Sequence, residues 1–100
     1  KYLELWNNKD LSGLSSIFHR DIVIKDWENH SEGLEEALKA NARIFSDLPA
    51  IEARLIKSAI NGDSAFLQLE IQIDKDRCID VVDIMTIEKG QIISILAYRQ

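Results

Sequence analysis

One acidic residue stands in the middle of an apolar stretch of this sequence, where a carboxyl group can do proton chemistry. Asp83 lies inside the run from Cys78 to Ile87, with Val81 and Met85 two positions away on the same strand face. An unpaired carboxylate among apolar side chains is costly to keep ionised, so Asp83 either finds a partner or stays protonated. A protonated carboxyl group is a hydrogen-bond donor. The alternative is a structural carboxyl group bonded to a tyrosine or to a backbone amide.

Asp26 is a second carboxyl group with apolar neighbours. It falls on the same face as Ile22 and Ile24 in the alternating stretch from Asp21 to Glu28. Taken alone, an Asp near a strand end is more simply an exposed residue. Tyr2, taken alone, is more simply an aromatic ring at the edge of the core.

Periodicity predicts the elements that position these residues. Apolar residues at helical spacing indicate helices over 1–9, 11–18 and 34–46, with Asp10 as the N-cap of the second. Asn29 to Gly33 reads as a polar loop. Strands are predicted over 21–28, 51–60, 64–73, 78–87 and 91–99.

This order of elements predicts one α+β domain over residues 1–100. The turns Asn61-Gly62-Asp63 and Glu88-Lys89-Gly90 join consecutive strands into an antiparallel meander. Helices would then cover one face of a curved sheet and leave a pocket at one end.

The amino-acid composition limits the classes of binding partner that this chain can have. The net charge of −5 provides no basic surface for nucleic acid, and no apolar run is long enough to span a membrane. Cys78, the single cysteine, reads as a small buried apolar residue and favours a reducing, cytoplasmic location. Apolar residues such as Phe66 on the outer face of the sheet predict a homodimer through that face.

Three segments of the chain resemble the nuclear transport factor 2-like (NTF2-like) cone fold, also called the SnoaL-like or cystatin-like fold. They are the stretch from Tyr2 to Leu11, the stretch from Phe18 to Gly33 that contains Asp26, and the stretch from Val82 to Ser94 that contains Asp83. Within that fold, the positions of Tyr2, Asp26 and Asp83 resemble the ketosteroid isomerase branch.

The resemblance implies a cofactor-free and metal-free proton transfer next to a carbonyl group, which moves a double bond. Asp26 would be the general base, and Tyr2 with protonated Asp83 would form the oxyanion hole, as in the handling of carbonyl substrates by ketosteroid isomerase. A small hydrophobic substrate would fill the pocket. Its candidate walls are Trp6, Phe18, Trp27, Leu38, Asn41, Phe45 and Met85.

Two positions depart from the branch. Trp27 replaces the proline that follows the base, and Asn41 stands where a tyrosine would support the oxyanion hole. Asn41 is either a polar group facing the pocket or a core amide bonded to a backbone carbonyl. The alternative functions are a non-catalytic module for ligand binding or dimerisation, and a SnoaL-like cyclase, dehydratase or hydrolase using Asp26 with His30.

Overall fold

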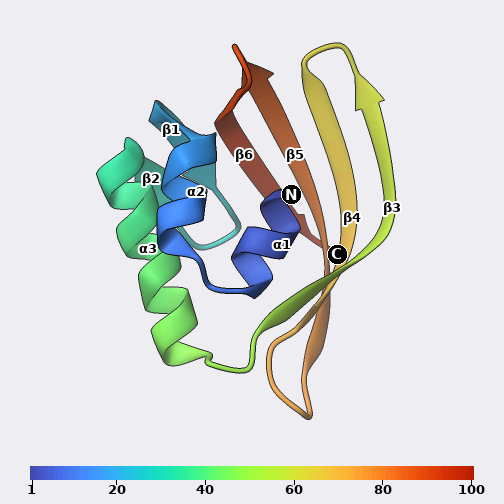
Figure 1. Cartoon of the computed structure of the whole chain (residues 1–100). Helices are drawn as coiled ribbons and strands as arrows, with labels where there is room; N and C mark the ends of the chain where they lie inside the picture. Colours follow the sequence, from blue (N-terminus) through green and yellow to red (C-terminus); the bar gives the residue numbers. More distant parts are fainter.

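A six-stranded sheet is the frame of the computed structural model, which describes residues 1–100. The strand order is β2-β1-β6-β5-β4-β3, and the three helices lie together on one face of the curved sheet (Figure 1). The α+β prediction is therefore confirmed. In chain order the elements are α1 (Tyr2–Asn7), α2 (Leu11–Ile17), β1 (Phe18–Lys25), β2 (His30–Glu32), α3 (Leu34–Asp47), β3 (Glu52–Asn61), β4 (Ser64–Gln72), β5 (Cys78–Glu88) and β6 (Gln91–Arg99).

The last four strands form the predicted antiparallel meander. Asn61 pairs with Ser64 across the first turn, where Gly62 has a φ of 61°. Glu88 pairs with Gln91 across the second turn, where Lys89 and Gly90 have φ values of 50° and 79°. In the second turn both central residues have the positive φ of a type I′ hairpin turn, which Gly90 adopts without steric cost, whereas in the first turn only Gly62, the first central residue, has a positive φ.

The first two strands differ from the prediction. β1 begins at Phe18, earlier than expected, and it pairs in parallel with β6. The segment expected as a loop contains β2, which pairs with β1 through Ser31 opposite Ile24. A strand of only three polar residues has almost no recognisable sequence pattern, so β2 can be identified only by its pairing with β1.

The core lies between the helices and the concave face of the sheet. Leu14 of α2 and Ile22 of β1 are fully buried there, and α3 contributes Ala37 and Phe45. Asp10 caps α2 as predicted, accepting a hydrogen bond from the Gly13 amide at 2.9 Å.

Asn7 attaches α1 to the edge of the sheet. Its side-chain amide donates to the Ala53 carbonyl at 2.8 Å, and its side-chain oxygen accepts from the Ala53 N–H at 2.7 Å. The pair imitates a strand pairing, so it satisfies both backbone groups of a residue on edge strand β3.

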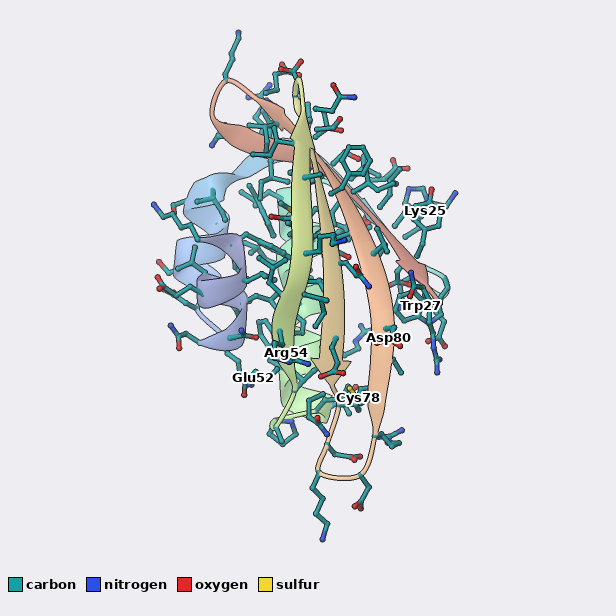
Figure 2. All side chains as sticks on the ribbon, turned by 90° about the vertical axis from the view of Figure 1, so that its right-hand side faces the viewer. Lys25, Trp27, Glu52, Arg54, Cys78 and Asp80 are labelled. Carbon is teal, nitrogen blue, oxygen red and sulfur yellow. The ribbon has the colours of Figure 1, made fainter.

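The prediction that Cys78 is a buried residue is wrong, because its side chain is exposed. It lies at the start of β5 on the same parity as Asp80, which faces away from the helices (Figure 2). A strand end on the outer face has nothing packed over it in a single chain, and apolar character alone cannot show this.

Candidate functional site

A cavity of about 250 Å³ lies between the helices and the concave side of the sheet. Sixteen of its 21 lining residues are hydrophobic. Tyr2, Asp26 and Asp83 all line it, although they come from α1, the turn directly after β1 and the middle of β5. An apolar pocket with a few convergent polar groups is the usual form of a small-molecule site.

Asp83 is buried at the centre of the concave face. It is 6% exposed and faces inward together with Val81 and Met85. Burial raises the pKa of Asp83 to about 6, and the negative charge of Asp26 adds to the rise. A carboxyl group with this pKa carries its proton in mildly acidic solution, where an ordinary aspartate is ionised.

Tyr2 is the second group able to donate a proton in the cavity. Its ring lies 6.2 Å from the ring of Phe18, which supports it from the core side. Burial raises the pKa of the Tyr2 phenol, and the charge of Asp83 raises it further. The phenol therefore stays neutral and remains a hydrogen-bond donor at physiological pH.

Neither the Tyr2 hydroxyl nor the Asp83 carboxyl makes a hydrogen bond to another group of the chain. Every fully buried polar side-chain atom of the chain has a hydrogen-bond partner. The unbonded oxygen atoms of Tyr2 and Asp83 are therefore not fully buried, and they face the cavity that both residues line. They are therefore available to a ligand.

Asp26 is held in a fixed orientation by the turn that follows β1. Its Oδ1 accepts the Glu28 N–H at 2.7 Å and the Asn29 N–H at 2.6 Å, and its own N–H donates to the Asn29 carbonyl at 2.9 Å. The second carboxylate oxygen takes no hydrogen bond from the chain and is free for a ligand. Because the charge of Asp26 acts on Asp83, the two carboxyl groups lie near enough to influence each other across the cavity.

Asn41 has a positioning role. Its Oδ1 accepts the Trp6 indole N–H at 3.0 Å, and its Nδ2 donates to the Ala37 carbonyl at 2.9 Å. Asn41 lines the cavity, and its side-chain amide is also buried and hydrogen-bonded. Both predictions for Asn41, a polar group facing the pocket and a core amide bonded to a backbone carbonyl, are therefore correct in part. Its main contact fixes the Trp6 ring, which packs edge-on against Phe45 at 5.3 Å.

Four of the expected pocket walls need correction. Phe18, Phe45 and Met85 belong to the buried core and do not line the cavity, and Leu38 packs against that core. Apolar periodicity identifies the inward face of an element but does not separate its packed part from its cavity part. Trp6 and Trp27 do line the cavity.

Sequence reasoning missed the isoleucine-rich wall contributed by the sheet and α3. Ile24, Ile71 and Ile79 lie on inward-facing strand positions and line the cavity. The strand alternation carries this signal, because Ile71 and Ile79 are directly paired on the face that holds Asp83.

His30 lies outside the cavity, and its imidazole is 3.1 Å from the Glu32 carboxylate at the surface. No cluster of three or more His, Cys, Asp or Glu side chains has the spacing to bind a metal ion. None of the helices combines the length and the hydropathy required of a membrane span.

The architecture and the enclosed apolar site define an NTF2-like protein of the α+β cone class. The family model for the SnoaL-like domain matches residues 1–95. The chain therefore belongs to the SnoaL-like domain family.

Solved structures share this fold at low sequence identity. A Sinorhizobium meliloti protein assigned as a polyketide cyclase has a TM-score of 0.88 at 20% identity, over 96% of this chain and 88% of that one. A Catenulispora acidiphila protein with a ketosteroid isomerase-like fold, in complex with trimethylamine, has a TM-score of 0.86 at 15% identity over 97% and 80%. An epoxide hydrolase of Mycobacterium tuberculosis has a TM-score of 0.84 at 14% identity, over 99% of this chain and 77% of that one. The search of curated proteins gives no match.

Proposed function

We propose that this protein is a cofactor-free isomerase that moves a double bond next to the carbonyl group of a small hydrophobic substrate. The observation that carries the proposal is the meeting of three groups in one apolar cavity: a fixed carboxylate, Asp26, and two proton-bearing groups, Tyr2 and Asp83, with no partner in the chain.

Each group has a defined part in the proposed reaction. The free oxygen of Asp26 removes a proton from the carbon next to the carbonyl, and the same carboxyl group returns it to a carbon further along the conjugated system. Tyr2 and neutral Asp83 donate hydrogen bonds to the carbonyl oxygen as it gains negative charge. Donors oriented in advance in an apolar cavity need little rearrangement during the reaction.

The protonation of Asp83 limits the working range. With a pKa of about 6, the donor form of Asp83 declines as the pH rises above that value. A ligand that fills the cavity removes water from around this carboxyl group, which favours the neutral form further.

Replacement of the base tests the proposal. Asp26→Asn should lower the turnover of a β,γ-unsaturated ketone by about 10²- to 10⁴-fold, because the general base is lost. The matched control is Asp80→Asn, an exposed aspartate on the opposite face of β5, which should leave turnover unchanged. Unchanged turnover in Asp26→Asn contradicts the proposal.

Ligand binding without turnover distinguishes the second candidate function. A non-catalytic binding module is favoured by the engagement of Asn41 with Trp6, which leaves no supporting hydroxyl behind Tyr2. Phenol, a mimic of the enolate, should bind the native chain and lose affinity in Tyr2→Phe if the oxyanion hole operates. Tight binding of apolar ligands that Tyr2→Phe does not weaken, with no turnover of any enone, identifies the binding module.

We further propose that two copies associate through the outer face of the sheet. The register places Phe66 beside Ile84, Ile84 beside Leu96, and Val82 beside Tyr98 on that face. Tyr98 is 56% exposed in the single chain. An apolar cluster at the centre of an uncovered sheet favours a second copy as its partner.

A further inference from the structure

A small side hollow lies next to the main cavity beside Asp26. It has a volume of about 90 Å³, which is room for about three water molecules. It shares Ile24, Asp26, Asn29, Asn41 and Ile44 with the main cavity, so a ligand in the cavity can extend a substituent into it. Its remaining lining residues are Ser31, Ala40 and Arg43.

Ser31 gives the hollow an unused buried hydroxyl. The residue is only 7% exposed, and its strand position opposite Ile24 turns it inward. Its hydroxyl makes no hydrogen bond to the chain. Because no fully buried polar atom is left without a partner, this hydroxyl faces the hollow. A serine hydroxyl so placed is available to a polar group of a ligand.

Arg43 adds an unpaired positive charge. It lies on the flank of α3, near Ala40, and forms none of the ion pairs of the molecule. The side-chain amide of Asn29 is likewise free of hydrogen bonds to the chain. Ser31, Asn29 and Arg43 therefore line one hollow with three kinds of hydrogen-bond donor.

The single acidic group in the hollow is already partly engaged. Two backbone amides donate to one oxygen of Asp26, which spreads its negative charge into the turn. Arg43 lines the same hollow and forms no ion pair with Asp26, so its guanidinium is available to a ligand. A planar anion matched to a guanidinium fork is the best partner for this donor set.

We infer that the side hollow is a subsite for a carboxylate, held by Arg43, Ser31 and Asn29. If the subsite is combined with the proposed function, the substrate is an unsaturated keto acid; this statement of the substrate rests on the proposed function. Its apolar body and ketone lie in the main cavity, and its acid group lies beside Arg43. The binding of the acid group itself does not depend on catalysis.

Binding of matched acids and amides to the full chain tests the subsite. The probes are phenylacetate, 3-phenylpropanoate and 4-phenylbutyrate, each compared with its own carboxamide by titration calorimetry. At least one acid should bind about tenfold more tightly than its amide, since a hydrogen-bonded charge pair has about that effect. Arg43→Gln should remove this preference, and Ser31→Ala should reduce it.

A control variant tests whether the preference for acids depends on the side hollow. Arg99→Gln removes the same charge at an exposed position at the end of β6 and should keep the preference. Equal binding of every acid and its amide, or a preference that survives Arg43→Gln, overturns the inference. Because the probes carry no ketone, failure of the isomerase proposal appears only in the Asp26→Asn turnover and leaves this comparison intact.

Discussion

Asp83 decides whether the cavity offers a hydrogen-bond donor or a negative charge. The same burial that makes it useful also makes its ionised form unfavourable in the folded chain. The raised pKa of Asp83 therefore determines both its ability to donate a hydrogen bond and the loss of stability when it ionises, and both effects can be measured.

The stability of the folded chain should fall as pH rises through the titration of Asp83. Its pKa is raised from 3.8 to about 6, so the folded state holds the proton more tightly than the unfolded state does. The contribution to stability is fully present below the unfolded value and is lost as pH passes the folded value. About two pH units at 1.4 kcal/mol each amount to about 3 kcal/mol.

Urea unfolding at about pH 4 and at about pH 8 measures this contribution. Asp83→Asn cannot ionise, so its stability should lack this loss, whereas Asp80→Asn should behave as the native chain does. An equal pH dependence in the native chain and Asp83→Asn would show that Asp83 is already ionised near its ordinary pKa.

Individual residues were predictable to different degrees. The inward position of Asp83 follows from the parity of Val81 and Met85, which the sequence shows directly. The turn that fixes Asp26 depends on two backbone amides, and the Trp6–Asn41 bond joins residues 35 positions apart. The Asp26 turn is a local pattern, in which an Asp side chain accepts the backbone N–H groups two and three positions later, whereas the Trp6–Asn41 bond has no local pattern and only the folded chain reveals it.

At the scale of elements, the site depends on how α1 is held against the sheet. This helix has six residues, too few to be stable alone, yet it carries Tyr2 and Trp6 into the cavity. Its tertiary contacts must hold it, and the double hydrogen bond of Asn7 to Ala53 is the most specific of them.

Loss of this attachment should destabilise the chain and disturb the site together. Asn7→Ala leaves both backbone groups of Ala53 without their side-chain partner, which should cost about 2 kcal/mol of unfolding free energy. Asn8→Ala is the matched control, because Asn8 is exposed and its side chain makes no hydrogen bond to the chain. Urea unfolding gives the cost, and equal stability of the two variants contradicts the role of Asn7.

The elements themselves were largely predictable. Long periodic segments such as α3 and alternating segments such as β4 carry their own signal. β2 is too short to carry a signal of its own and is recognised only by its pairing with β1. The parallel pairing of β1 with β6 joins segments far apart in the sequence, which no local pattern shows.

At the scale of the whole molecule, the sheet separates two tasks. Its concave face holds the site and is covered by the helices (Figure 1). Its outer face carries an apolar cluster on β4, β5 and β6, formed by Phe66, Val82, Ile84, Leu96 and Tyr98. In the single chain none of these five side chains is fully buried, so association of two copies would remove apolar surface from water.

The native chain should therefore sediment as a dimer at micromolar concentration. Ile84→Lys places a charge at the centre of the cluster and should give monomers, because an unpaired charge is costly to bury in an interface. Ile60→Lys is the control: Ile60 is 81% exposed but shares the parity of the concave face at the sheet edge, so this variant should remain a dimer. A monomeric native chain, or dissociation by Ile60→Lys but not by Ile84→Lys, contradicts the outer face as the interface. Since the cavity lies on the opposite face, Ile84→Lys should retain ligand binding, which separates the assembly from the site.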